Sequence, residues 1–174
     1  MSSKPFLIQL TRQEMSMCKQ AAALRWQLAR AAGVYNQRND QVRSDQDIDY
    51  LGLRGETAVA KAYDLNYSPA ALGIDDGVDM FIAGMSMDVK TSFHSEGVLL
   101  FKNPDAVKAD LLFMATNTPE ENIMWLLGWT TREYFLANAE PFANDKSLGL
   151  SQDKLRRPET LWRLKAQREH GTAA

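Results

Sequence analysis

The sequence has almost none of the residues that disulfides, zinc sites and thiol catalysis need. Its 174 residues contain one cysteine, Cys18, and two histidines. A single cysteine cannot form an intramolecular disulfide, and it supports neither a Cys/His zinc cluster nor a Cys–His nucleophile pair. We therefore expect neither a structural zinc site nor thiol chemistry.

Long hydrophobic runs are also missing. No apolar run approaches the roughly 18 residues that a membrane span requires, and the N-terminal MSSKPFLIQL lacks the long apolar stretch and cleavage site of a signal peptide. We expect no membrane segment and a cytoplasmic location. The composition, 45% apolar and 24% charged residues, is typical of one folded domain spanning residues 1–174.

The net charge of −2 is small but unevenly distributed. Residues 1–39 carry six Lys or Arg against one acid, and residues 151–174 carry six against three, so the middle of the chain is strongly acidic. An acidic centre between basic ends suits a protein that binds cations centrally and a polyanion with its flanks. Solvated charged helix faces are an equally simple interpretation.

Apolar periodicity predicts helices at both ends of the chain and a sheet between them. A capping box at Thr11 and Glu14 begins a helix over residues 11–37, and a second helix covers residues 49–63. After Gly73 the period changes to two, which predicts a small sheet. Its strands are residues 78–82, 87–92, 98–101, 111–115 and 123–129. A helical region follows over about residues 130–170, so the predicted fold is mixed α/β, with four to five strands flanked by helices.

Charged residues cluster on the first predicted hairpin. Alternation along a strand places Asp88 and Lys90 on one side and Val89 on the other, buried side. A loop of about four residues would pair Asp79 with Lys90, so that Asp79 lies beside both charged residues. Two carboxylates this close repel each other unless a cation neutralises them, and oxygen ligands suit Mg²⁺ or Mn²⁺. The pattern predicts a metal site, with Lys90 beside a water molecule.

A third carboxylate, Glu56, lies in the helix just upstream of the hairpin. It follows Gly55, where the backbone can approach the sheet closely. Together these acids meet the needs of phosphodiester hydrolysis, which requires an activated water and charge neutralisation at the phosphate. The alternative is an exposed hairpin, with Asp79 in a turn, Lys90 as its ion-pair partner and Glu56 on a solvated helix face.

The segments Gly55-Glu56, Val78-Asp79 and Asp88-Val89-Lys90 together resemble the PD-(D/E)xK nuclease superfamily. The chain contains no other Asp-x-Lys or Glu-x-Lys, and the resemblance covers about residues 50–130. It implies a restriction-endonuclease-like sheet and a Mg²⁺-dependent nuclease, in which Mn²⁺ is expected to substitute. The catalytic residues would be Glu56, Asp79, Asp88 and Lys90. The metal ligands would be the Asp79, Asp88 and Glu56 carboxylates and the Val89 carbonyl.

This sequence departs from the superfamily pattern at several points. Val78 replaces the proline, and the helix between the third and fourth strands is reduced to residues 103–110. No Gln-x-x-x-Tyr follows the lysine, which disfavours the branch that resembles the RecB and phage lambda exonucleases. The Gly-Trp-Thr-Thr turn at residues 128–131 is similar to that of small phage-encoded members.

Other residues have competing interpretations. Five are candidate contacts to nucleic acid or simply surface residues: Lys61, Ser92, His94, Arg156 and Arg157. Asp75 and Asp76 are rivals to Asp79 as metal ligands, but a turn is the simpler role. The four tryptophans are expected in the core rather than stacked on bases: Trp26, Trp125, Trp129 and Trp162.

The sequence predicts an endonuclease that cuts DNA through contacts to its backbone phosphates, and a homodimer is also considered. The alternatives are a non-catalytic nucleic-acid-binding or inhibitory module on the same fold, and a nuclease that cleaves RNA.

Overall fold

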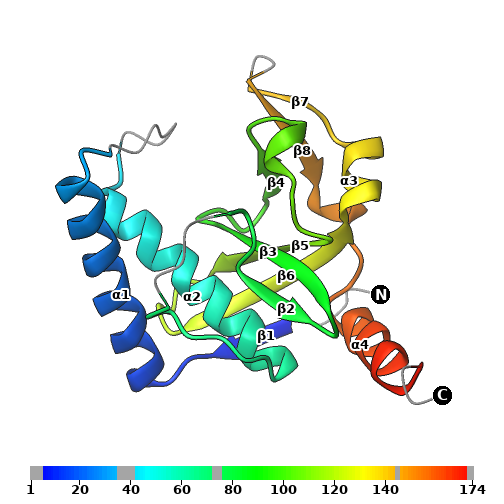
Figure 1. Cartoon of the computed structure of the whole chain (residues 1–174), viewed down its shortest axis with the longest axis horizontal. Helices are drawn as coiled ribbons and strands as arrows, with labels where there is room; N and C mark the ends of the chain where they lie inside the picture. The colour runs from blue at the N-terminus through cyan, green and yellow to red at the C-terminus, as the bar shows by residue number, and fades with distance from the viewer. Residues whose placement is uncertain (1–5, 35–41, 72–75, 144–145, 172–174) are drawn as a thin grey trace.

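The computed structural model describes residues 6–34, 42–71, 76–143 and 146–171 (Figure 1). These residues form two sheets and four α-helices. The elements in chain order are β1 (Phe6–Gln9), α1 (Arg12–Ala31), α2 (Asp45–Tyr63), β2 (Met80–Ile82), β3 (Met85–Ser92), β4 (Val98–Phe101), β5 (Leu111–Asn117), β6 (Ile123–Thr131), α3 (Arg132–Asn138), β7 (Glu140–Phe142), β8 (Ser147–Ser151) and α4 (Glu159–Gly171).

The central sheet has five strands in the order β1-β6-β5-β3-β2. Its pairs are antiparallel except β3 and β5, which run parallel. A parallel pair needs a crossover connection, and β4 with the short 3₁₀ turn η1 (Pro104–Ala106) provides it. The mixed α/β class is therefore confirmed, and the connection before β5 is reduced to one short turn, as predicted.

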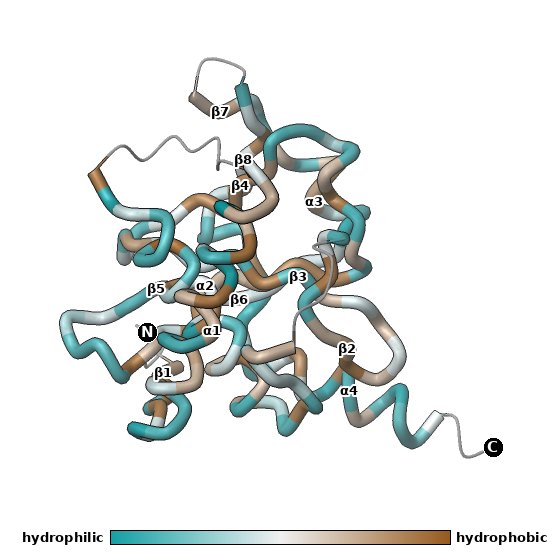
Figure 2. The backbone as a smooth tube through the Cα atoms, turned by 60° about the vertical axis from the view of Figure 1, so that its left-hand side comes forward, coloured by the Kyte–Doolittle hydropathy of each residue, from teal (hydrophilic) through white to brown (hydrophobic). Residues whose placement is uncertain are grey.

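Two hydrophobic cores lie on the two faces of the central sheet. On one face, α2 and α4 pack on β3, β5 and β6 through residues such as Val59, Tyr63 and Leu161. On the other, β4, β8 and α3 contribute Leu99, Leu150 and Phe135. Figure 1 shows α2 crossing the sheet with α1 beside it, while the second sheet rises away from them. Figure 2 shows hydrophilic residues along most of α4.

The second sheet, with strand order β4-β8-β7, differs from the prediction. Residues 98–101 do form a strand, but it pairs with β8 instead of joining the central sheet. The region predicted as helical, residues 130–170, contains α3 and α4 but also strands β7 and β8. Strand β7 is fully exposed and contains Pro141, and such a short strand carries little apolar periodicity.

The helix boundaries follow their capping residues. Thr11 and Glu14 form the predicted capping box of α1. A second capping box, Ser44 with Asp47, begins α2 four residues before the predicted start at residue 49, because it lies in a polar segment that resembles a loop. Helix α1 ends at Ala31, and residues 35–37 of the predicted helix lie outside the described residues.

The hairpin between β2 and β3 has a different register from the predicted one. Met80 pairs with Met87 and Ile82 pairs with Met85, so the turn contains two residues, Ala83 and Gly84, rather than four. Continuing this register places Asp79 beside Asp88, and the predicted pairing of Asp79 with Lys90 is wrong. Both turn residues have positive φ, 47° and 79°, as a tight two-residue hairpin requires.

Replacing Ala83 should stabilise the protein, because a left-handed conformation costs an alanine about 1 kcal/mol. Ala83→Asn creates Asn-Gly, the preferred pair for this turn, and should raise the free energy of unfolding by about 1 kcal/mol and the melting temperature by about 2–4 °C. Thermal unfolding followed by circular dichroism measures the change. Ala143→Asn makes the same substitution at another left-handed position, φ 54°, and serves for comparison. A lower melting temperature for Ala83→Asn would contradict the expected strain.

Candidate active site

The predicted acidic residues meet where β2 and β3 separate. Asp79 precedes β2, Asp88 and Lys90 lie in β3, and Glu56 lies in α2. Helix α2 approaches β3 at Gly55, where a Cβ atom would lie 1.9 Å from Thr91 Oγ1. Glycine is therefore required for this close contact, as the sequence predicts, and the contact brings Glu56 to the sheet.

Gly55→Ala should destabilise the protein by about 2 kcal/mol, because the added methyl group overpacks the contact with Thr91. Thr91 Oγ1 is buried and makes no hydrogen bond with any described residue, so Thr91→Ala alone should cost little. The double variant should recover most of the loss. Urea unfolding of the four proteins measures the coupling, and equal losses with and without Thr91 would show that the helix does not depend on this contact.

Asp88 and Lys90 form an ion pair on one side of β3. Lys90 Nζ lies 2.7 Å from Asp88 Oδ1, and Asp88 is 2% exposed whereas the Lys90 side chain is 45% exposed. The ammonium group also lies 5.1 Å from the ring centroid of Phe101 in β4. The shared side that strand alternation predicts is confirmed. Asp88 is held in the interior, and Lys90 extends from it towards solvent.

Asp79 continues the hydrogen bonding of β3 beyond the start of β2, partly through its side chain. Its backbone N–H donates to the Met87 carbonyl at 2.9 Å, and its carboxylate Oδ2 accepts the Val89 N–H at 2.7 Å. The N–H and C=O of one strand residue point to the same side, so the Val89 carbonyl also points towards Asp79. The carboxylate and this carbonyl are oxygen donors beside one another.

The carboxylates share one electrostatic environment. Burial raises the pKa of Asp79 to about 8; the negative charges of Glu56 and Asp88 add to the rise, while the Val89 hydrogen bond and Lys90 oppose it. Burial also raises the pKa of Glu56, which the Tyr67 hydrogen bond and the positive charge of Arg25 oppose. Mutual repulsion of this kind is relieved by a cation.

The site offers oxygen atoms of the kind that bind a divalent ion, but the described side chains do not form a preassembled set of ligands. Across residues 6–34, 42–71, 76–143 and 146–171, no three Asp, Glu, His or Cys side chains are arranged to hold one ion together. Lys90 engages Asp88, and Tyr67 engages Glu56. The Asp79 and Asp88 carboxylates with the Val89 carbonyl are nevertheless the hard oxygen donors that Mg²⁺ prefers.

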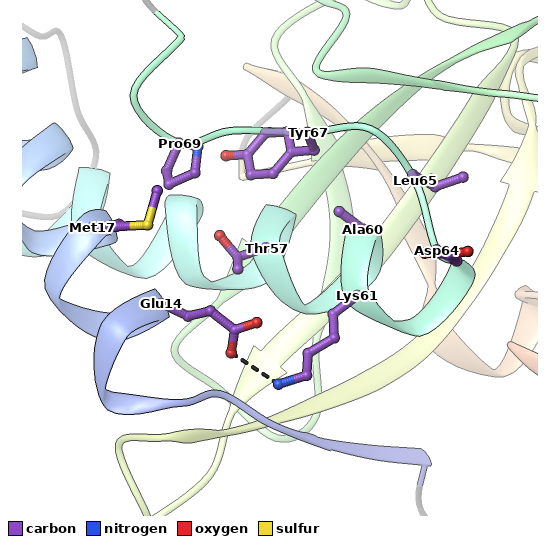
Figure 3. Close-up of a pocket in the computed structure, with 9 residues that line it drawn as sticks. All are labelled: Glu14, Met17, Thr57, Ala60, Lys61, Asp64, Leu65, Tyr67 and Pro69. Carbon is purple, nitrogen blue, oxygen red and sulfur yellow. Dashed lines mark hydrogen bonds and ion pairs between the residues drawn. The ribbon is translucent and has the colours of Figure 1, made fainter.

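Tyr67 and Arg25 are neighbours of Glu56 that the sequence did not single out. The Tyr67 hydroxyl donates to Glu56 Oε2 at 2.6 Å, and Tyr67 also lines a pocket of about 340 Å³ beside α2 (Figure 3). Tyr67 lies in the loop after α2, and Arg25 lies on α1. No periodic pattern in the sequence relates either residue to Glu56. Their proximity depends on how α1 and the loop pack around α2.

Lys61 lies on the wall of the same pocket and makes contacts within the fold. Its Nζ donates to the Gln9 carbonyl at 2.9 Å and pairs with Glu14 at 2.9 Å (Figure 3). These bonds join α2 to β1 and α1. They account for Lys61 without a nucleic-acid contact, which stays a prediction.

Ser92 and His94 lie just past Lys90, at the end of β3. The Ser92 hydroxyl accepts the His94 N–H at 3.0 Å, and His94 is exposed. The structure therefore keeps both near the strand that carries Asp88 and Lys90. Among the rival acids, Asp76 Oδ1 accepts the Val78 N–H at 3.1 Å, as a turn residue does, and Asp75 lies outside the described residues.

Arg156 and Arg157 belong to a different part of the structure. They precede α4, which packs at the C-terminal end of α2, where the Tyr63 hydroxyl donates to the Pro158 carbonyl at 2.7 Å. The fold does not bring these arginines to the carboxylates.

The comparisons with known proteins do not assign the chain to a family. No helix in the part of the chain that the structure describes is both long and apolar enough to cross a membrane. The sequence matches no protein-family model, and no curated protein sequence matches it.

Proposed function

We propose that the protein is a metal-dependent endonuclease that hydrolyses phosphodiester bonds in DNA. The observation that carries the proposal is the placement of Asp79, Asp88 and Glu56 near one end of the β2–β3 hairpin, beside Lys90, where burial and the neighbouring negative charges raise the pKa of Asp79 to about 8. Perturbed pKa values of this kind, in carboxylates beside a lysine, cluster at functional sites.

The position of each residue sets the role that it would have in the reaction. Asp79, Asp88 and the Val89 carbonyl would hold Mg²⁺ or Mn²⁺, with Glu56 adding negative charge nearby. When bound, such an ion would act as a Lewis acid that lowers the pKa of a water molecule and offsets the charge that develops on the phosphate. Lys90, which is 45% exposed, would donate hydrogen bonds from Nζ to the attacking water or to a phosphate oxygen. Tyr67 would keep Glu56 in place.

The proposal is tested with a panel of duplex, junction, flap and single-stranded DNAs, incubated with Mg²⁺, Mn²⁺ or EDTA. We expect metal-dependent internal cleavage of at least one DNA and none in EDTA. Matched DNA and RNA hairpins in the same panel distinguish DNA from RNA as the substrate. Absence of cleavage of every nucleic acid in both metals would overturn the proposal.

One observation favours a non-catalytic module instead: the described residues include no assembled three-ligand group, and Lys90 and Tyr67 already engage Asp88 and Glu56. Calorimetric titration with Mg²⁺ and Mn²⁺ distinguishes the two functions. A nuclease should bind the ion, and Asp79→Asn with Asp88→Asn should abolish that binding. Binding that the double variant leaves unchanged would favour the inert module.

A further inference from the structure

A groove rich in arginine lies along the start of α4, away from the carboxylates. It has a volume of about 470 Å³, and Arg156, Arg157 and Arg163 line it together with Thr160 and Gln167. Residues 155–167 contain four basic residues in all and one acid, Glu159. The groove therefore combines a concave surface with a strong local excess of positive charge.

The arginines are available to a ligand to different degrees. Arg163 is exposed, and its side chain makes no hydrogen bond or ion pair with the other described residues. Arg157 pairs with Glu159 at 3.2 Å, and both side chains are largely exposed. An exposed pair of this kind contributes at most about 1 kcal/mol, so an anion can compete for Arg157 at little cost.

Arg156 and the groove wall are held more firmly. The backbone of Arg156 forms two hydrogen bonds with Trp129, at 2.8 and 3.0 Å, and its guanidinium carbon lies 4.9 Å from the Trp129 ring centroid. Trp129 Nε1 donates to Thr160 Oγ1 at 3.0 Å, and the Thr160 hydroxyl donates to the Arg157 carbonyl at 2.6 Å. This chain of contacts fixes the groove before any ligand binds.

We propose that this groove binds the phosphate backbone of duplex DNA at a site separate from the one where the DNA is cut. The inference rests on the proposed function and adds a second contact point. Guanidinium groups bind phosphate oxygens through two parallel hydrogen bonds, and the apolar Leu155 and Leu164 on the lining suit the sugar between two phosphates.

The groove and the carboxylates lie at different positions relative to α2. Tyr63, at the end of α2, donates to the Pro158 carbonyl just before α4 and contacts Trp162 in α4, whereas Glu56 lies two turns earlier in the same helix. DNA that contacts the groove and the carboxylates would therefore have to extend beyond the cut.

The experiment measures DNA binding without cleavage. A labelled duplex of about 20 base pairs is titrated with protein in EDTA, at several salt concentrations, by fluorescence anisotropy. Arg157→Gln with Arg163→Gln should raise the Kd at least about tenfold and lower the salt slope by about 2, because two phosphate contacts are lost. The matched control, Lys146→Gln with Arg168→Gln, removes the same charge outside the groove and should change neither quantity by as much.

The outcomes separate this inference from the proposed function. Unchanged DNA binding by the groove variant, or an equal loss in the control variant, overturns the groove and leaves nuclease activity untouched. A selective loss supports the groove even if no DNA is cut. If the groove variant lost binding to pyrophosphate but bound DNA like the wild type, the groove would be a site for small anions. That result would also overturn the inference.

Discussion

Lys90→Met and Asp88→Asn should each reduce the rate of DNA cleavage about 10³-fold or more in Mg²⁺. Loss of one preorganised group that stabilises developing charge typically costs 10²- to 10³-fold. These two residues act as a unit, because Lys90 Nζ lies 2.7 Å from the buried Asp88 Oδ1, and removing either charge takes away an opposite charge close to the other residue. Single-turnover rates on the DNA that the wild type cuts best measure the effect.

The two substitutions preserve shape, so that loss of activity is not loss of fold. Methionine keeps an unbranched side chain of similar length, and asparagine matches aspartate in size. The controls are Lys154→Met and Glu140→Gln, which break another lysine–carboxylate pair, 3.1 Å apart, on the surface. We expect the controls to cleave at the wild-type rate. Variants at 88 and 90 that are folded and fully active would remove these residues from the mechanism.

Local rules predicted the parts of the site that depend on neighbouring residues. Strand alternation placed Asp88 and Lys90 on one side, and their ion pair confirms it. Glycine at position 55 indicated a close approach of helix and sheet, and the 1.9 Å distance from a Cβ to Thr91 Oγ1 confirms that too. Such features follow from the geometry of one strand or one helix, which the sequence encodes directly.

The errors arose where long-range packing or an unusual backbone decides the structure. Ala83 adopts a left-handed conformation, which alanine rarely does, so the two-residue turn and the true neighbour of Asp79 could not be predicted. Strand β1 was missed because its partner is β6, more than a hundred residues away. Trp129 is buried as predicted, but Trp26 and Trp162 are 36% and 41% exposed, since each lies on a helix with only one covered side.

The nucleic-acid contacts were the least predictable part. The sequence grouped Arg156 and Arg157 with Lys61 as basic residues of equal standing, whereas the fold uses Lys61 to join α2 to β1 and α1. It leaves Arg157 and Arg163 on the wall of a groove. Charge alone cannot distinguish these roles, because both depend on which elements pack around each side chain.

The largest expected effect on stability comes from Asp79. Burial raises its pKa from 3.8 to about 8, so the folded protein holds a proton that the unfolded chain releases above about pH 4. The stability from this group is complete below the unfolded pKa and is lost as the pH rises through about 8. Asp79→Asn is uncharged at every pH, and its amide oxygen still accepts the Val89 N–H. Without metal at pH 8, it should exceed the wild type in stability by an amount on the order of 4 kcal/mol.

The measurement is urea unfolding at pH 5 and pH 8, in EDTA and in Mg²⁺. In EDTA the advantage of Asp79→Asn should be large at pH 8 and small at pH 5, and Mg²⁺ should stabilise the wild type but not the variant. Asp110→Asn is a control of opposite sign. Hydrogen bonds from the Ser86 backbone and hydroxyl lower the pKa of Asp110, so its stability is present at high pH and lost as the pH falls. Equal stability of Asp79→Asn and the wild type at pH 8 in EDTA would mean that neither burial nor the neighbouring carboxylates disfavour the Asp79 charge, and the physical reason for a cation at this site would disappear.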